Sequence, residues 1–193
     1  MRTYEEKIRE TISDVIAYTW SYAIWWELVK KENIQRYIKA AQTYPNFYQA
    51  IVGSFEQGIC VTTHRLFDEG KNKKILSLPK LVNQLKASNV SLAKRLQDLL
   101  DAEKENIKSV VLVRHGVYAH RNKSQCPQNV YSAAKITPRK IKSLVYLSQK
   151  IIVALAESAE IENKDFLTDN FNHCERDVQD ETHLILQSIA ARL

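Results

Sequence analysis

The stretch T-Y-E-E-K-I-R-E-T-I-S-D-V-I-A-Y-T-W-S-Y-A-I-W-W-E-L-V-K-K, residues 3–31, predicts a long amphipathic helix. Residues suited to one buried face recur every three or four positions, the spacing of a helical stripe. Five aromatic residues in its second half spread more widely than one stripe requires, so we expect most in the core and some at a subunit interface. The expected buried face consists of Ile8, Ile12, Val15, Ile16, Thr19, Ala23, Trp26 and Val29. The five aromatic residues are Tyr18, Trp20, Tyr22, Trp25 and Trp26.

Similar patterns continue along the chain and predict further helices. Only four glycines and four prolines are present, which argues against an all-β fold with many tight turns. Prolines and capping residues suggest helix starts at Pro45, Ser77-Leu78-Pro79, Ser91 and Thr137-Pro138. The expected helices are residues 46–67, a short one after Ser77, 91–114, 138–160 and 174–191, with loops around Gly70 and over 123–135.

The predicted fold is therefore an all-α bundle of four main helices, a short extra helix and a C-terminal helix. Residues 1–160 are expected to form the helical domain, with 161–193 as an acidic extension packed on it. Gly53 and Gly58 lie inside the second predicted helix, where close helix–helix contact is a plausible reason for them.

Composition excludes several classes of protein. No run of 18 apolar residues could span a membrane, and the charged start lacks the apolar segment of a signal peptide, so we expect a cytoplasmic protein. Three cysteines without paired spacing indicate free thiols. His173-Cys174 has no second pair at ligand spacing, so neither a metal nor another cofactor is expected.

Charge is distributed unevenly along the chain. Residues 70–156 hold 17 Lys/Arg and 4 Asp/Glu, a net charge of +13, whereas residues 157–193 hold 3 and 9, a net charge of −6. A basic centre is the footprint of a polyanion partner, although a charge run by itself is more often a solvated face. The charge signs also allow the acidic end to fold over the basic segment as an inhibitory lid.

The basic segment contains R-H-G-V-Y-A-H-R-N-K, residues 114–123. RNA carries its own nucleophile, so its cleavage needs proton-transfer groups and positive charge on the transition state. His120 can accept or donate a proton near neutral pH, and Arg114 can neutralise the developing charge. His115, Arg121 and Lys123 could supply a second proton-transfer group and hold flanking phosphates.

The spacing of this motif creates a geometric problem. On a straight helix at about 100° per residue, Arg114 and His120 lie about 120° apart. They would not face one phosphate, so the site requires a bend near Gly116, a new backbone segment at His120 or a second subunit.

The motif resembles the arginine-x(4–6)-histidine motif of the HEPN superfamily. The string V-Y-A-H-R-N-K resembles the signature of its abortive-infection branch, the Abi U-type proteins. T-H-R-L-F-D, residues 63–68, followed by L-S-L-P-K-L, residues 76–81, resembles a second string of that branch. The resemblance covers roughly residues 5–160.

This resemblance implies a dimeric helical bundle and, for many members, metal-independent endoribonuclease activity in toxin or antiviral systems. The catalytic residues would be Arg114, His115 and His120. Asn122 stands where the family has an acidic residue, and it also occupies the position of the tyrosine to which nucleotides are transferred in some HEPN toxins. A cognate antitoxin or nucleotidyltransferase partner is a further expectation, although regulation by that transfer is a poor model here.

Other interpretations stay open. Arg114 could form a salt bridge to Asp68, and His120 could bind carbonyls at a helix end. Arg65 and Asp68 could pair with each other and brace the motif. Tyr118 could stack on an RNA base or pack in the core. The alternative function is a non-catalytic HEPN module that binds RNA, nucleotide or a protein partner.

Overall fold

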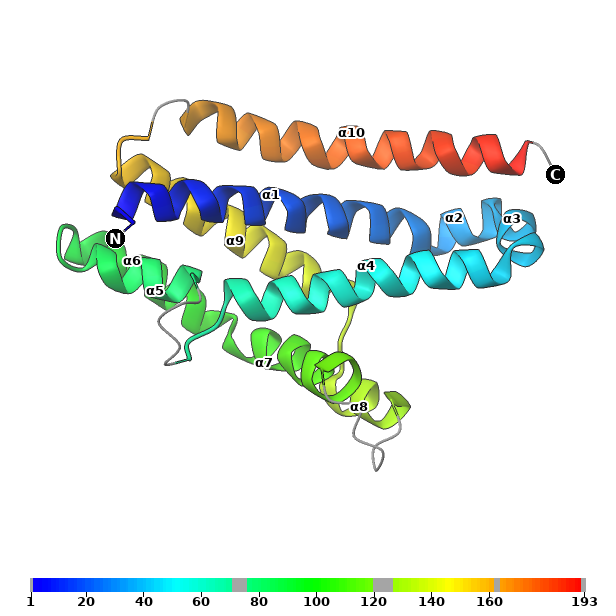
Figure 1. Ribbon diagram of the computed structural model, residues 1–193, viewed down its shortest axis with the longest axis horizontal. Coiled ribbons are helices and arrows are strands. Elements are labelled where there is room, and N and C mark those ends of the chain that lie inside the picture. Colours follow the sequence, from blue (N-terminus) through cyan, green and yellow to red (C-terminus); the bar gives the residue numbers. More distant parts are fainter. Residues whose placement is uncertain (1, 71–75, 120–126, 162–163, 192–193) are drawn as a thin grey trace.

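The computed structural model describes residues 2–70, 76–119, 127–161 and 164–191, and these residues fold into helices without strands (Figure 1). The bundle predicted from the sequence is confirmed. In chain order the helices are α1 (Tyr4–Val29), α2 (Lys31–Arg36), α3 (Ile38–Thr43), α4 (Pro45–Leu66), α5 (Leu78–Leu85), α6 (Val90–Ala102), α7 (Lys104–Val113), the π-helix η1 (Arg114–Ala119), α8 (Pro127–Ala134), α9 (Pro138–Ser158) and α10 (Lys164–Ala190).

Helix α1 is the centre of the bundle and packs against α4, α9 and α10. Thr3 begins it with a capping box, in which its hydroxyl accepts from the Glu6 amide at 3.1 Å and its own amide donates to the Glu6 carboxylate at 2.7 Å. Tyr18, Tyr22 and Trp25 are buried, whereas Trp20 is 44% exposed. The expectation that most of these aromatics lie in the core is confirmed.

A buried carboxylate fixes the turn from α1 into α2. Glu27 is 3% exposed and receives hydrogen bonds from Lys30 and from the Asn33 side chain, each at 2.6 Å. The Asn33 amide also donates to the Glu27 carbonyl at 2.9 Å. A buried charge is tolerated when it is paired and hydrogen-bonded in this way. Neither α2 nor α3 was expected from the sequence.

The helix expected over 91–114 is divided into α6, α7 and the start of η1. Asn89, not Ser91, caps α6 by accepting from the Leu92 amide at 3.0 Å. The α6–α7 break falls at Glu103, whose carboxylate accepts from Asn106 at 2.5 Å and from Ser143 of α9 at 3.0 Å. These two hydrogen bonds, one local and one to another helix, hold the break between α6 and α7, where the sequence predicted one straight helix.

Other boundaries also differ from the sequence expectations. The expected loop over 123–135 contains α8, because Val130 and Ala134 bury one face of a short helix. Ser77 stands at the N-cap of α5, but its hydroxyl donates to the Asp68 carbonyl at 2.6 Å instead of capping. The last helix begins at Lys164 rather than at 174. By contrast, Thr137 caps α9 as expected.

Close packing does not explain Gly53 or Gly58, because a Cβ atom at either position would meet nothing within 4 Å. The prediction of helix–helix contact there is wrong.

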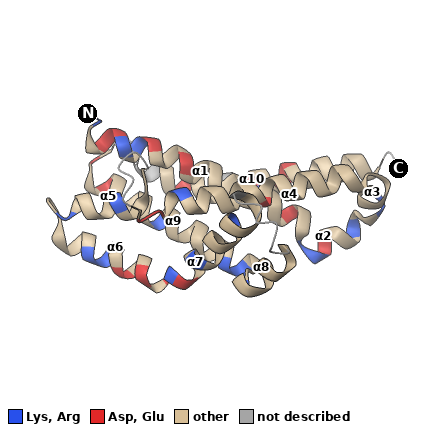
Figure 2. Cartoon of the chain, turned by 60° about the horizontal axis from the view of Figure 1, so that its bottom comes forward, with Lys and Arg blue, Asp and Glu red and all other residues tan. Residues whose placement is uncertain are grey.

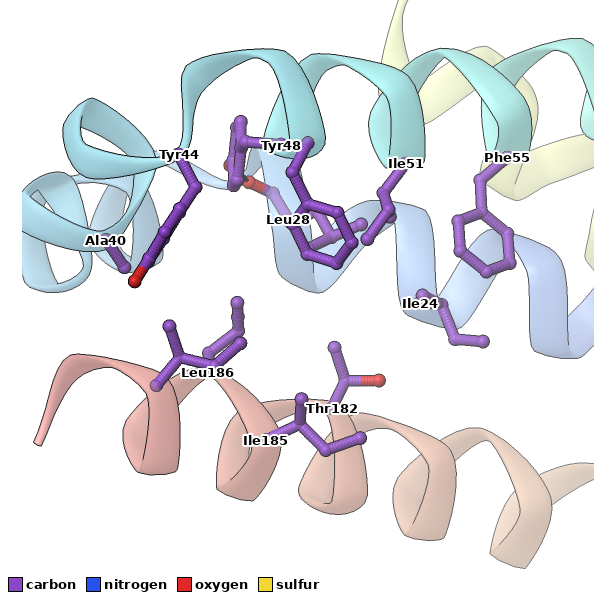
Figure 3. Close-up of a pocket in the computed structure, with 12 residues that line it drawn as sticks. Ile24, Leu28, Ala40, Tyr44, Tyr48, Ile51, Phe55, Thr182, Ile185 and Leu186 are labelled. Carbon is purple, nitrogen blue, oxygen red and sulfur yellow. Dashed lines mark hydrogen bonds between the residues drawn. The ribbon is translucent and has the colours of Figure 1, made fainter. Parts of the chain in front are cut away.

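Helix α10 packs along α1, α9 and α3, and in Figure 1 it lies on the opposite side of α1 from α7 and α8. Among the described residues α10 therefore lies away from α7 and α8, which contradicts the lid hypothesis. At its C-terminal end α10 faces α1 and α4 across an apolar groove of about 720 Å³ (Figure 3). Ile24, Leu28, Phe47, Ile51, Phe55 and Ile185 are among the residues that line it. Over the described residues, none of the helices is both long and apolar enough to cross a membrane.

Candidate functional site

The basic histidine motif lies where α7 changes its helical geometry. Val110 and Val113 are fully buried and anchor the last turns of α7 in the core. From Arg114 to Ala119 the backbone is a π-helix, which contacts α4, α7 and α8. π-helical turns are rare and often occur at functional sites. The expected departure from a straight α-helix is thus present, and it begins at Arg114, two residues before Gly116.

Gly116 allows η1 to approach α8 closely. A Cβ atom at this position would lie 2.8 Å from Cγ1 and 3.0 Å from Cγ2 of Val130. Val130 is buried at 5% exposure and has a short, stiff side chain, so it cannot move aside cheaply. Gly116 is therefore explained by its contact with α8.

A hydrogen-bonded group of side chains holds the other end of the π-helix. The Tyr118 and Tyr131 hydroxyls lie 2.8 Å apart, and the Glu56 carboxylate of α4 is hydrogen-bonded to both tyrosines. Burial, followed for Tyr131 by the Glu56 hydrogen bond, raises the pKa of both phenols, that of Tyr118 to about 12. Tyr118 packs against the core, which favours its structural interpretation over base stacking.

Three side chains from two helices form the polar cluster of the site. Arg114 Nη1 lies 3.1 Å from Nδ1 of His115. A guanidinium group only donates, so this Nδ1 accepts and a neutral His115 carries its proton on Nε2. The His115 ring meets the ring of His64 from α4 edge to face, with centroids 5.2 Å apart and planes at 89°. We call Arg114, His115 and His64 the histidine–arginine cluster.

The surroundings of His64 favour its neutral form. Desolvation is the main cause that lowers its pKa from 6.5, and the positive charge of Arg114 lowers it further. The carboxylate of Asp68, four residues later on the chain, acts in the opposite direction. His64 is half-buried and His115 is exposed, so the cluster lies at the protein surface.

Asp68 and Arg65 have separate partners. Lys80 Nζ lies 3.0 Å from Oδ2 of Asp68, and the pKa of Asp68 is lowered because the hydrogen bonds from Lys80 and the Gly70 backbone outweigh desolvation. Arg65 Nη2 lies 2.7 Å from Oδ1 of Asp14 in α1. The proposed pair between Arg65 and Asp68 is therefore wrong. Among the ion pairs formed by described residues, Arg114 takes part in none, so its salt bridge to Asp68 is not found either.

Four residues of the expected site, His120, Arg121, Asn122 and Lys123, lie outside the described residues. The structure brings Arg114 and His115 together, and the charge of Asp68 acts on the neighbouring His64. Sequence reasoning missed His64 itself. A signal was present, since His64 stands inside the T-H-R-L-F-D string and four residues before Asp68, one helical turn.

Basic residues occur along α5, α6 and α7, the helices that lead into the cluster (Figure 2). Within the part of the chain that the structure describes, no group of three His, Cys, Asp or Glu residues is placed to hold a metal ion. The thiol of Cys60 is buried, and desolvation raises its pKa to about 12, which makes it a poor nucleophile. The imidazoles of this cluster can transfer protons, and the Arg114 guanidinium can bind an anion.

An all-α bundle is the fold that the HEPN resemblance implies, and the described residues have this fold. The family model for AbiU2, HEPN_AbiU2, matches residues 4–176. The chain therefore belongs to the AbiU2 family of HEPN proteins, an abortive-infection family. The comparison with curated proteins and the comparison with solved structures gave no match.

Proposed function

We propose that this protein is a metal-independent endoribonuclease of a toxin–antitoxin or phage-defence system. The observation that carries the proposal is the surface cluster of Arg114 and His115 at the start of a π-helix, within a segment of net charge +13. Arg114 neutralises charge that develops on the phosphate, and His120 transfers a proton. Arg121 and Lys123 hold flanking phosphates, and Asn122 supports the motif.

The reaction uses the 2′-hydroxyl of RNA as its nucleophile. A base removes the proton from the 2′-hydroxyl as the 2′-oxygen attacks the phosphorus, the bond from phosphorus to the 5′-oxygen breaks, and the 5′-oxygen takes up a proton from His120 as general acid. The products are a 2′,3′-cyclic phosphate and a 5′-hydroxyl. No metal ion takes part in these steps. Binding of the phosphate also fits the polarity of this surface, in contrast to the apolar groove beside α10 (Figure 3).

A homodimer is part of the proposal. It rests on the HEPN resemblance and on the aromatic-rich helix α1, in which Trp20 is 44% exposed. Two copies would place two motifs on one assembly, and a cognate antitoxin or nucleotidyltransferase would be its regulator. A non-catalytic HEPN module that binds RNA or nucleotide remains the second candidate, because the same positive charge binds phosphate without cleaving it.

Incubation of wild type and His120→Ala with total RNA in a chelator tests the proposal. We expect wild type to cleave and His120→Ala to be at least about 100-fold slower, the usual effect of losing a proton-transfer group. RNA binding without cleavage by wild type would favour the non-catalytic module. Equal cleavage by the two proteins would contradict the role of His120.

A further inference from the structure

The motif itself does not contain every histidine of the site. His64 comes from α4, a different part of the chain, and its ring lies against that of His115 with centroids 5.2 Å apart. Arg114 is bonded to His115 and is close enough to His64 for its charge to act on that ring. A phosphate held by Arg114 would therefore lie beside both imidazoles.

The two imidazoles differ in what they can do. Because Nδ1 of His115 accepts from Arg114, the other nitrogen of the neutral ring carries the proton and can only donate. That suits a contact with a phosphate oxygen. It does not suit removal of a proton, which needs a nitrogen with a lone pair directed at the substrate.

We propose that His64 is the general base of this site, which removes the proton from the 2′-hydroxyl of the scissile nucleotide. This inference rests on the proposed ribonuclease function and adds a residue outside the R-x(5)-H segment to its machinery. The proton moves from the 2′-oxygen to the unprotonated nitrogen of His64 as the 2′-oxygen–phosphorus bond forms. The bond to the 5′-oxygen breaks, and that oxygen takes a proton from the general acid, His120 in the proposed function.

The electrostatic setting of His64 supports this role. Burial and Arg114 lower its pKa below the usual value of 6.5, so the ring is neutral and ready to accept a proton at neutral pH. Among the described groups that act on it, Arg114 of η1 opposes its charged form and Asp68, which follows the end of α4, favours it. Asp68 would stabilise the imidazolium that forms when the proton arrives, and Lys80 holds Asp68 in place at 3.0 Å.

If His64 had a purely structural role, its replacement would have a different effect on cleavage. An edge-to-face contact positions the His115 ring and is lost on truncation, but no small molecule in solution would restore it. A proton acceptor, in contrast, can be replaced by free imidazole that enters the space left by the side chain. Imidazole rescue therefore separates the two roles.

The experiment compares wild type, His64→Ala and a control, His173→Ala, on one oligoribonucleotide in chelator, with and without imidazole. His173 is an exposed histidine of α10 whose Nδ1 lies 2.7 Å from the carbonyl oxygen of Asp169. We expect His64→Ala to lose about 100-fold or more in rate, to recover part of it with imidazole, and His173→Ala to match wild type. The wild-type rate should fall as the pH drops through the pKa of His64, below 6.5, and this dependence should be absent in unrescued His64→Ala.

The outcomes separate the two proposals. Two results would overturn the role of His64 and leave the proposed ribonuclease function intact. The first is cleavage by His64→Ala at the wild-type rate. The second is a loss of rate that imidazole does not rescue, with the acidic limb of the pH profile still present. Absence of cleavage by wild type would overturn the ribonuclease and this inference together. Thermal melting of each variant identifies unfolding, and Asp68→Asn then provides the second test. This variant keeps His64 and should shift the acidic limb to lower pH, whereas an unmoved limb would contradict the proposal.

Discussion

The rings of His64 in α4 and His115 in η1 meet edge to face, with their centroids 5.2 Å apart. This contact joins the T-H-R-L-F-D string to the arginine–histidine motif, two segments that are remote in sequence. Arg114 completes the cluster through its 3.1 Å contact with His115. His64 from the first string and Arg114 and His115 from the described part of the motif thus lie together at the protein surface.

The cluster makes folding stability depend on pH in the acidic range. The pKa of His64 is lowered in the folded protein, so the unfolded chain binds more protons below pH 6.5. The contribution of His64 is present above pH 6.5 and is lost as the pH falls through its folded pKa. We expect the difference in unfolding free energy between pH 7.5 and 5 to be smaller in His64→Ala than in wild type. Denaturant unfolding at the two pH values measures this difference, and an equal difference in the two proteins would contradict a lowered pKa of His64.

Gly116→Ala should disturb the π-helix, because its new methyl group would lie 2.8 Å from Val130. Overpacking of this kind costs about 1–3 kcal/mol in unfolding free energy. Val130→Ala alone is also destabilising, since it opens a cavity at a buried position. The double variant should be less destabilised than the sum of the two single variants, because the smaller side chain at 130 makes room for the methyl group. Additive effects in denaturant unfolding would show that the close approach is not the reason for Gly116.

Asp68 and Arg65 should differ in their importance. The Asp68–Lys80 pair has side chains 15% and 24% exposed, whereas those of Arg65 and Asp14 are 49% and 27% exposed. Exposed pairs contribute about 0.2–1 kcal/mol, so Arg65→Ala should change the unfolding free energy little and leave RNA cleavage unchanged. Asp68→Asn should destabilise the fold more, because it removes the negative charge of the less exposed ion pair with Lys80. A reversed order in thermal melting would be inconsistent with these contacts.

Alkaline solution should weaken the attachment of η1. Burial raises the pKa of Tyr118 to about 12, while the tyrosines of an unfolded chain ionise near 10. Stability from this group is complete below pH 10 and is lost as the pH rises toward 12, because the unfolded chain releases its proton first. Tyr118→Phe should therefore lose less stability than wild type between pH 9 and 11. Identical slopes in that range would contradict the burial of the Tyr118 hydroxyl.

Much of the fold can be predicted from helical periodicity and caps. The spacing in residues 3–31 and the Thr137-Pro138 start predict α1 and α9 within a few residues. The boundaries that the sequence does not predict depend on contacts between helices. The break at Glu103 depends on a hydrogen bond from Ser143 of another helix, and α8 is stabilised by burial of Val130 and Ala134 in a segment that is polar in sequence.

The candidate site could be predicted only in part from the sequence. Local spacing and family resemblance identify Arg114 and His115, which are adjacent in the chain. They do not identify His64, because its relation to the motif is created by the packing of α4 against η1. The π-helical backbone was also not predictable, although the angular mismatch between Arg114 and His120 indicated that a straight helix would not suffice.

The chemistry of the new RNA ends shows whether the 2′-hydroxyl is the attacking group. A single oligoribonucleotide is incubated with wild type in excess chelator, and the new termini of the products are identified by mass spectrometry. We predict 2′,3′-cyclic phosphate and 5′-hydroxyl ends, and no cleavage of the same strand with a 2′-deoxy nucleotide at the scissile position. Products with 3′-hydroxyl and 5′-phosphate ends, or cleavage of the deoxy-substituted strand at the same bond, would contradict attack by the 2′-hydroxyl.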